Sequence, residues 1–273
     1  MPRLLDHLAE VAELFEGPRP GLMADVDGTL SEMVVRPEEA RVPPGIRESL
    51  RELSRRLPVV AVVSGRSAKD AFRMVGLEEL VYFGNHGMER IDRGERRVVE
   101  AFRPYLPELR TAIGLLAASL SIPGIWLEDK EVSISLHYRH AQDRVQAHER
   151  VLQAIDALPN RYRFRIIEGK MVVNLLPAAG SSKGTAITAL VGERRLSGAL
   201  FIGDDVTDLD AFRAIRELRR DGSFRGINVA VLGAEPDSRV QREADYTLQD
   251  VNEVSRFLDW LAQRTVEGRS ARP

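Results

Sequence analysis

The sequence predicts an α/β fold in which a parallel sheet, covered by helices on both faces, is interrupted by an inserted α+β domain. Two observations lead to this prediction. Both ends of the chain alternate short, almost wholly apolar runs with amphipathic helical patterns, as buried parallel strands and their connecting helices do. The middle of the chain instead carries segments in which polar and apolar residues alternate, as antiparallel hairpins do.

The first part of the chain carries one half of the parallel core. Apolar residues at helical spacing predict a first helix, which "GPRPG" ends before a buried apolar run. A second amphipathic pattern, "GIRESLRELSRR", leads to the apolar run "PVVAVVS". The expected elements are a helix over 4–15, a strand over 22–26, a helix over 45–56, a strand over 58–64 and a strand with its turn over 79–87.

The middle of the chain is predicted to form the insert. A helix over 104–120 precedes the stretch "IWLEDKEVSISLHYR", whose alternation is typical of a half-exposed hairpin. Its polar residues on one face are Ser133, Ser135, His137 and Arg139. A helix over 142–158 and a second hairpin over 163–177 follow. We therefore expect one small domain built from two β-hairpins and two helices.

After the insert, the pattern of the first part resumes. The expected elements are a helix over 183–191, a strand over 198–205, a helix over 208–218, short strands over 227–231 and 245–248, and an amphipathic C-terminal helix. The core domain is therefore predicted to be discontinuous. It comprises residues 1–102 and 178–273, and the insert comprises residues 103–177.

The composition favours a globular protein that acts on a small molecule. Hydrophobic residues make up 44% of 273, which is enough for a sizeable core. The 39 basic and 41 acidic residues are interspersed, so no basic stripe indicates a nucleic-acid partner. No apolar run approaches the roughly 18 residues that span a bilayer, and the charged start does not resemble a signal peptide. We expect a cytoplasmic monomer without membrane or nucleic-acid partners.

The cysteine and lysine content limits which residues can act as catalysts or ligands. The chain contains no cysteine, which excludes thiolate zinc sites and cysteine nucleophiles. The few lysines in this arginine-rich chain are Lys69, Lys130, Lys170 and Lys183. A lysine supplies a compact point charge where arginine supplies a planar fork, so these positions are candidates for function.

Polar residues follow the predicted core strands at the point where each strand ends. They are Asp25 and Asp27, then Ser64 and Arg66, then Asn85 and His86, and finally Asp204 and Asp205. The carboxyl ends of parallel strands meet at one edge of a sheet, so these residues are expected to form a single site. Neighbouring aspartates repel one another unless a hard cation neutralises them, and an all-oxygen ligand set suits Mg²⁺.

Structural interpretations compete with this functional one. "DVDGT" is also a common turn sequence, Ser64 could be a helix N-cap, and Asp205 could be a ligand or a capping residue. His86 is more typical of a structural turn residue than of a catalyst. The spacing does not fit a calcium loop, and the sequence lacks the glycine motifs of nucleotide-binding and dinucleotide-binding loops.

The motifs "DVDGT", "VVSGR", the lysine of "SSKGTA" and "GDDVTDLDAF", in that order, resemble those of the haloacid dehalogenase superfamily. "GNHGME", "LEDKEVSISLHYR" and "GKMVV" resemble the trehalose-6-phosphate phosphatase family over roughly residues 20–215. The resemblance implies a Rossmann-like hydrolase core with an inserted cap that closes over a sugar-phosphate substrate. It also implies a Mg²⁺-dependent phosphatase that hydrolyses trehalose 6-phosphate through an aspartyl-phosphate intermediate.

The resemblance also implies roles for individual residues, which the residue chemistry supports. Asp25 is the expected nucleophile, Asp27 the general acid and base, Ser64 a phosphate ligand and Lys183 a stabilising charge. The expected Mg²⁺ ligands are Asp25, the main-chain carbonyl of Asp27, and Asp204, with Asp208 supporting the metal through water. The expected substrate contacts are Arg66, Glu128, Lys130, Lys170 and Asn174. His137 and Arg139 could instead hold the insert together.

One departure from the family pattern leaves the substrate open. The family usually places a glutamate and then a basic residue before the proline that ends the second hairpin, whereas this chain has Asn174 and Leu176. A neutral amide donates and accepts hydrogen bonds where a carboxylate only accepts them. The alternatives are another glycosyl phosphate, such as that of glucosylglycerol, sucrose or mannosylglycerate, and a non-catalytic sugar-phosphate binding module.

Overall fold

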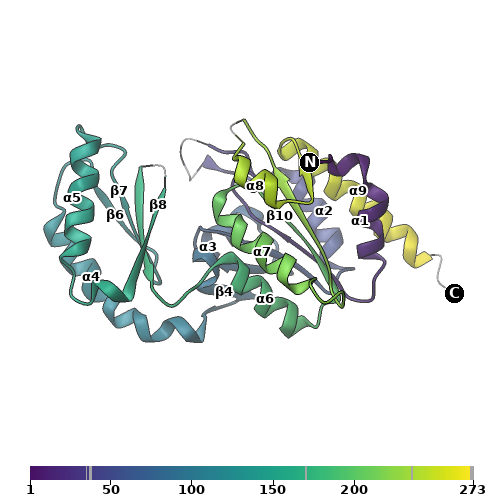
Figure 1. Ribbon diagram of the computed structural model, residues 1–273, viewed down its shortest axis with the longest axis horizontal. Helices are drawn as coiled ribbons and strands as arrows, with labels where there is room; N and C mark the ends of the chain where they lie inside the picture. The colour runs from purple at the N-terminus through teal and green to yellow at the C-terminus, as the bar shows by residue number, and fades with distance from the viewer. Residues whose placement is uncertain (35, 37–38, 170, 235, 271–273) are drawn as a thin grey trace. The chain divides into compact units, whose positions relative to one another are not determined.

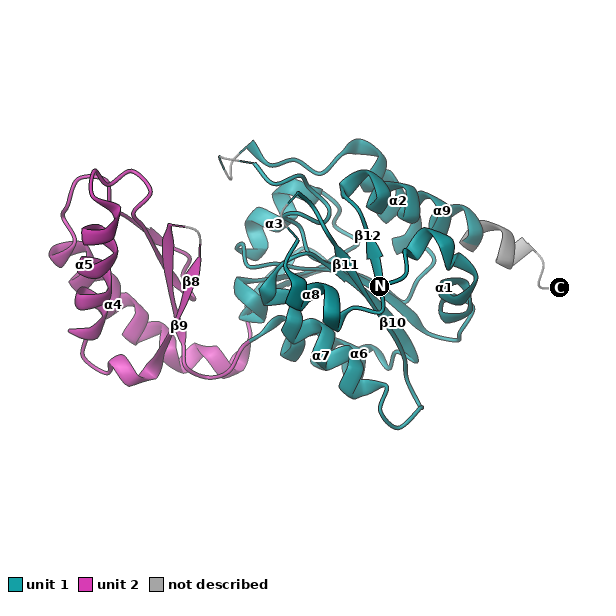
Figure 2. Ribbon diagram, turned by 45° about the horizontal axis from the view of Figure 1, so that its top comes forward, with its two compact units in different colours: residues 1–97, 182–273 teal, residues 98–181 magenta. Residues whose placement is uncertain are grey.

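The chain folds into two compact units (Figure 2). Unit 1 comprises Met1–Arg97 and Ser182–Pro273, and unit 2 comprises Val98–Ser181, which includes the predicted insert. The computed structural model describes residues 1–34, 36, 39–169, 171–234 and 236–270, and side chains up to residue 264. Within these residues, no helix is long and apolar enough to cross a membrane.

Unit 1 is built on an eight-stranded sheet with the order β12-β11-β10-β1-β2-β3-β4-β5. Figure 1 labels β10 and β4 of this sheet and the helices around it. The strands are β1 Pro20–Ala24, β2 Val59–Val63, β3 Val81–Gly84, β4 Glu89–Asp92, β5 Glu95–Val98, β10 Gly198–Gly203, β11 Arg225–Val231 and β12 Tyr246–Leu248. Neighbours from β12 to β3 are parallel, and β4 pairs with β3 in the antiparallel direction. The parallel sheet predicted from the apolar runs is confirmed.

The middle of this sheet places the predicted polar residues together. β1 lies between β10 and β2, with Ala24 paired to Ile202 on one side and to Val62 on the other. All residues of these three strands are buried, as strands covered on both faces require. The residues that follow the three strands therefore emerge at the same edge of the sheet.

Helices cover both faces of the sheet. The first face packs against α1 Leu8–Phe15, α2 Pro44–Ser54, α3 Ala68–Val75 and α9 Val251–Ser270. The second face packs against α6 Lys183–Arg194, α7 Leu209–Leu218 and α8 Ser238–Glu243. Alternate strand residues divide between these two cores: Leu22 belongs to the first and Met23 to the second.

The predicted helix over 4–15 is broken at His7, whose φ of −125° is not helical, so a 3-10 turn over Leu4–Asp6 precedes α1.

Unit 2 holds the two hairpins and two helices that the sequence predicts. Its antiparallel sheet has the order β6-β7-β9-β8. The elements are α4 Leu106–Ser119, β6 Trp126–Asp129, β7 Ile134–His137, α5 Arg144–Asp156, β8 Phe164–Gly169 and β9 Val172–Pro177. One face of the sheet packs its apolar residues, such as Leu136 and Val173, against both helices. The hairpin β6–β7 is less exposed than predicted: Ser133 and Ser135 are 5% and 1% exposed, because β7 lies between two other strands.

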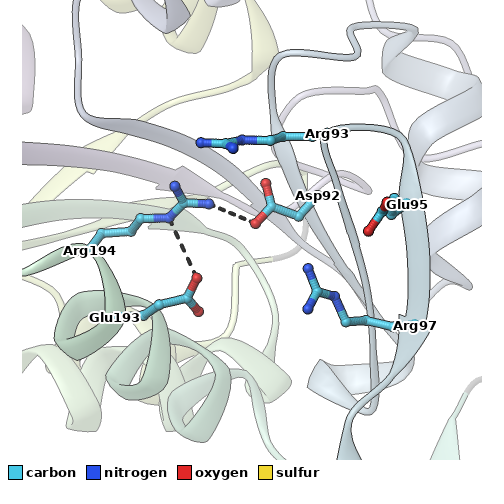
Figure 3. Close-up of a pocket in the computed structure, with 6 residues that line it drawn as sticks. All are labelled: Asp92, Arg93, Glu95, Arg97, Glu193 and Arg194. Carbon is cyan, nitrogen blue, oxygen red and sulfur yellow. Dashed lines mark hydrogen bonds and ion pairs between the residues drawn. The ribbon is translucent and has the colours of Figure 1, made fainter.

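Charged residues line a pocket in unit 1 (Figure 3). Its lining residues are Asp92, Arg93, Glu95, Arg97, Glu193 and Arg194. Because β4 is antiparallel to β3, Asp92 at the end of β4 lies beside the start of β3, away from the carboxyl ends of the parallel strands. Asp92 ends β4, which runs back along β3, and it accepts hydrogen bonds from Arg90 at 2.5 Å and from Arg194 at 2.6 Å. Asp92 and Arg90 are 8% and 9% exposed, so a nearly buried ion-pair network joins β4 to the end of α6.

Asp92→Ala is expected to lower the free energy of unfolding by about 2–3 kcal/mol, because the nearly buried guanidinium of Arg90 loses one of its carboxylate partners. Glu95→Ala removes an exposed carboxylate from the same pocket and should stay within about 0.5 kcal/mol of the parent protein. Urea unfolding of both variants measures the difference. Equal unfolding midpoints would show that the network adds nothing to stability.

Candidate active site

Gly28 shapes the turn after β1, and the side chain of Asp204 lies close to it. The carbonyl of Val26 accepts hydrogen bonds from the backbone N–H groups of Leu30 and Ser31, both at 2.9 Å. Gly28 has φ +77°, in the left-handed region that favours glycine. A Cβ at this position would lie 2.0 Å from Asp204 Oδ2. The turn therefore lets the loop after β10 approach the loop after β1 closely.

Asp25 is the first residue beyond β1, and its carboxylate is buried. Its backbone N–H continues the sheet by donating to Ile202 O at 2.9 Å, and the residue is 5% exposed. One carboxylate oxygen, Oδ2, lies 2.8 Å from Lys183 Nζ. The other, Oδ1, is buried without a hydrogen-bond partner among the described residues. A buried carboxylate oxygen in that state favours a cation beside it.

Lys183 bridges two acids from the start of α6. Ser182 caps this helix, since its hydroxyl accepts from the Thr185 backbone N–H, and this fixes the direction of the first turn. Lys183 is 1% exposed, and its Nζ lies 2.7 Å from Asp208 Oδ1 as well as close to Asp25. Asp208 was expected to support a metal through water, and its direct ion pair with Lys183 was not predicted.

The loop after β10 is held by Asp208 and by the turn after β1. Asp208 Oδ2 accepts from the backbone N–H groups of Asp204 and Asp205, both at 3.0 Å. Thr29 donates its hydroxyl to Asp204 Oδ1 at 3.0 Å. One carboxylate oxygen from each of Asp25, Asp204 and Asp208 lies within 4.8 Å of the other two. Three acids with one lysine leave net negative charge, and the all-oxygen donor set suits a hard divalent cation.

The pKa values of these groups show how strongly they interact. Burial raises the pKa of Asp25 from 3.8 to about 7, against the attraction of Lys183. Burial also raises the pKa of Asp204 from 3.8 to about 8, and the nearby charges of Asp25 and Asp208 add to it. Burial alone would lower the pKa of Lys183, but the carboxylates of Asp208 and Asp25 raise it above its ordinary value. The lysine is therefore charged at neutral pH, while the acids need further positive charge to ionise fully.

Asp27 lies outside the three-acid cluster and is held by Arg66. Arg66 Nε donates to Asp27 Oδ2 at 2.6 Å, and Nη2 donates to Oδ1 at 2.7 Å. Burial alone would lower the pKa of Arg66, but the bond to Asp27 raises it above its ordinary value. A bidentate pair of this kind fixes the direction of the carboxylate. Arg66 was expected to contact the substrate, and its pair with Asp27 was not predicted, although the two residues follow adjacent parallel strands.

Ser64 lies at the end of β2 and is 1% exposed. Its Oγ accepts from the Arg66 backbone N–H at 3.1 Å. The interpretation of Ser64 as a helix N-cap is wrong, because Ser67 caps α3 by accepting from the Asp70 backbone N–H. Asp205, by contrast, is a capping residue here: its Oδ1 accepts from the Val206 backbone N–H at 2.6 Å.

The segment "GNHGME" supports the loop after β2. Asn85 and His86 have φ of 49° and 57°, and Asn85 Nδ2 donates to Glu89 Oε1 at 2.7 Å. Glu89 is fully buried and also accepts from the Ala68 backbone N–H at 2.8 Å. The His86 ring lies against Gly65, where a Cβ would come within 2.9 Å of it. These contacts support the structural interpretation of this segment.

The predicted substrate residues of unit 2 lie along its sheet. Glu128 Oε2 is 3.0 Å from His137 Nε2 and 3.8 Å from Lys130 Nζ. Asn174 Oδ1 accepts from Ser135 Oγ at 2.6 Å. These residues belong to adjacent strands in the order β6, β7 and β9, apart from Lys130, which follows β6 in the hairpin turn. Lys170 lies outside the described residues.

Sequence comparison identifies related proteins. The profile of a family described as trehalose-phosphatase matches residues 23–252. A trehalose-phosphate phosphatase of Mycobacterium avium is 31% identical over 98% of this chain and 68% of its own length. A Mycobacterium tuberculosis protein described as an uncharacterized glycosyl hydrolase is 33% identical over 96% of this chain, which spans 20% of that protein's length. This chain thus corresponds to about a fifth of that relative.

Structure comparison shows a shared fold. The C-terminal domain of a C. albicans trehalose-6-phosphate phosphatase matches with a TM-score of 0.75. The match covers 96% of this chain and 98% of that one, at 23% sequence identity. At this identity, the likeness establishes the α/β architecture with its antiparallel insert and nothing more specific.

Proposed function

The chain belongs to the trehalose-phosphatase family with a haloacid dehalogenase-like fold, and from this premise we propose that it is a Mg²⁺-dependent phosphatase of trehalose 6-phosphate. The observation that carries the proposal is the buried cluster in which Lys183 Nζ lies 2.8 Å from Asp25 and 2.7 Å from Asp208. A carboxylate oriented by a charged amine, beside a place for a cation, is suited to attack on phosphorus.

In the first step of the proposed reaction, a carboxylate oxygen of Asp25 attacks the substrate phosphorus. The bond from phosphorus to the sugar oxygen breaks as the bond to Asp25 forms, which leaves an aspartyl-phosphate. Asp27 donates a proton to the departing sugar oxygen, so that trehalose leaves as a neutral alcohol. Lys183 holds Asp25 in place and offsets negative charge on the phosphoryl group, and Ser64 lies at the neighbouring strand end to bind a phosphate oxygen.

In the second step, water attacks the phosphorus of the aspartyl-phosphate. Asp27, now a carboxylate, takes the proton from this water, and the bond between phosphorus and Asp25 breaks. The products are phosphate and the original enzyme. In its carboxylate form, Asp27 is directed by two hydrogen bonds from Arg66.

The residues present fit a divalent cation. Asp25, Asp204 and the carbonyl of Asp27 would hold Mg²⁺, and the unpartnered Asp25 Oδ1 supports this assignment. Bound Mg²⁺ supplies positive charge that neutralises the acids and the substrate phosphate. Asp208 orients the loop that carries Asp204, and so acts on the cation site through that loop.

The proposal is tested by the hydrolysis of a panel of phosphates with purified protein and Mg²⁺. We expect the highest kcat/KM for trehalose 6-phosphate, followed by the phosphates of sucrose, glucosylglycerol and mannosylglycerate. Equal kcat/KM for all small phosphates would contradict specificity for a disaccharide. The absence of any phosphate release, with sugar phosphates still bound, would favour the non-catalytic binding module.

Asp27→Asn is expected to lower kcat/KM for trehalose 6-phosphate by about 10²–10⁴-fold, because the leaving alkoxide then departs without a proton in the step that kcat/KM reports. The loss should be about tenfold smaller for p-nitrophenyl phosphate, whose phenolate leaves without protonation. Asp205→Asn, which alters a capping residue, serves as the control and should retain activity. Equal losses for the two substrates would exclude Asp27 as the general acid.

Mg²⁺ is expected to raise the melting temperature more at pH 8.5 than at pH 5.5. Burial raises the pKa of Asp25 to about 7 and that of Asp204 to about 8 in the metal-free fold, so the folded state binds more protons than the unfolded chain between about pH 4 and 8. The metal-free protein therefore loses stability progressively as the pH rises from about 4 to about 8. Mg²⁺ binds the ionised acids and restores that stability.

Differential scanning fluorimetry with Mg²⁺ and with a chelator measures this pH dependence. In Asp204→Asn, the effect of Mg²⁺ on the melting temperature should be small at both pH values. A Mg²⁺ effect of the same size at both pH values in the parent protein would contradict a site made of these raised-pKa acids.

A further inference from the structure

The most exposed large apolar group on the unit 2 sheet is an indole beside the predicted sugar contacts. Trp126 is 58% exposed at the start of β6. It lies two residues before Glu128, so both side chains point to the same side of the strand. This side is opposite to the one that carries Leu127, which packs against the apolar core of unit 2. The indole therefore lies on the sheet face that the two helices leave uncovered.

The orientation of this indole is fixed by a neighbouring strand. Trp126 pairs with His137 of β7 in the sheet register, and their rings stack with centroids 4.3 Å apart at 21°. His137 Nε2 lies in turn 3.0 Å from Glu128 Oε2, and Lys130 Nζ lies 3.8 Å from the same oxygen. A carboxylate, an amine, an imidazole and an oriented indole thus form one contiguous group within unit 2.

This combination matches the chemistry of a pyranose. A pyranose ring has an apolar C–H face and a rim of hydroxyl groups that donate and accept hydrogen bonds. A flat indole covers the apolar face with little loss of side-chain entropy, because its own rotamer is already held by stacking. A sugar hydroxyl beside the ring can therefore donate a hydrogen bond to Glu128 or accept one from Lys130.

We propose that Trp126 is a specificity residue that stacks on a pyranose ring of the substrate. This inference rests on the proposed function and deepens it, since it names a contact for the sugar and assigns no role in the chemical step. Trp126 then acts on substrate binding, and His137 acts as a positioning residue that holds the indole. Phosphate esters without a sugar ring do not use this contact.

The kinetic test compares Trp126→Ala with Trp126→Phe and with a matched control. Tyr162 is also an exposed aromatic of unit 2, at 79%, but it lies in the 3-10 turn Arg161–Arg163 before β8, so Tyr162→Ala is the control. We expect Trp126→Ala to raise KM for trehalose 6-phosphate about tenfold, with kcat changed less than about twofold. Trp126→Phe should keep KM within about threefold, and Tyr162→Ala should match the parent protein. KM for p-nitrophenyl phosphate should stay unchanged in all three variants.

An unchanged KM for trehalose 6-phosphate in Trp126→Ala would overturn the proposal while leaving the phosphatase activity intact. An equal rise in KM for p-nitrophenyl phosphate would also overturn it, because that result indicates a general disturbance. A parent protein that hydrolyses no glycosyl phosphate would instead refute the proposed function, so the two failures are distinguishable. Circular dichroism melting curves show whether each variant is folded.

A binding measurement tests the same contact without turnover. The Asp25→Asn protein with Mg²⁺ is titrated with trehalose 6-phosphate, and its indole fluorescence is compared with that of the Asp25→Asn, Trp126→Phe double variant. The chain's other tryptophan, Trp260, is common to both proteins and is a partly buried residue that packs against the core of unit 1. We expect a saturable change in emission that the double variant lacks. Identical changes in both proteins would overturn the proposal.

Discussion

Asp25→Asn is expected to lower kcat for trehalose 6-phosphate by at least about 10⁴-fold, because a carboxamide cannot attack phosphorus. The variant keeps the shape of the side chain, and the amide oxygen can still accept from Lys183, 2.8 Å away in the parent protein. Burial and the charge of Asp208 raise the pKa of Asp25, so the carboxylate destabilises the metal-free fold. The metal-free variant should therefore be no less stable than the parent protein.

Phosphate release and urea unfolding measure these two effects separately. Asp210→Asn provides the control, since Asp210 belongs to the same "GDDVTDLDAF" stretch but forms an i,i+3 pair with Arg213 on α7. It should change kcat by less than about twofold. Retention of more than about 1% of the parent kcat in Asp25→Asn would remove Asp25 from the nucleophile's role.

Lys183→Met is expected to reduce both stability and activity. The side chain is 1% exposed and joins Asp25 to Asp208, which is fully buried. Its loss leaves two buried carboxylates without their counter-charge, which costs about 3–5 kcal/mol of unfolding free energy. The phosphoryl group also loses a stabilising charge, so kcat should fall by about 10²–10³-fold.

Lys183→Arg is also expected to lower activity, because the larger, planar guanidinium would have to replace a compact amine that is 1% exposed and lies between two carboxylates. Lys69→Met, which removes an exposed lysine from α3, is the matched control and should change the unfolding free energy by less than about 0.5 kcal/mol. If Lys183→Met were as stable and as active as Lys69→Met, the ion-paired cluster would have no part in folding or in catalysis.

The fold could be predicted where buried strands consist of apolar residues. β1, β2 and β10 are continuous apolar runs, and the structure buries each of them on both faces. β4 and β5 were not predicted, because their sequences, "ERID" and "ERRV", consist mostly of charged residues. β4 is nonetheless buried, since Glu89 pairs with Arg96 and Arg90 pairs with Asp92. Charged pairs of this kind leave no apolar pattern in a sequence.

The part of the candidate site that follows the ends of parallel strands could be predicted from the sequence. Polar residues after three adjacent parallel strands had to meet at one edge, and Lys183 does lie within 2.8 Å of Asp25. The pair between Asp27 and Arg66 and the direct bond from Lys183 to Asp208 depend on the directions of individual side chains. Spacing along the chain contains no information about those directions, so these contacts required coordinates.

The stereochemical course at phosphorus tests the central claim, that Asp25 attacks the substrate and forms a covalent intermediate. Trehalose 6-phosphate made chiral with oxygen isotopes and sulfur is hydrolysed, and the configuration of the released thiophosphate is determined. Each in-line displacement inverts phosphorus, so attack by Asp25 followed by attack by water predicts net retention. Net inversion would mean that water attacks the substrate directly, and would contradict the account.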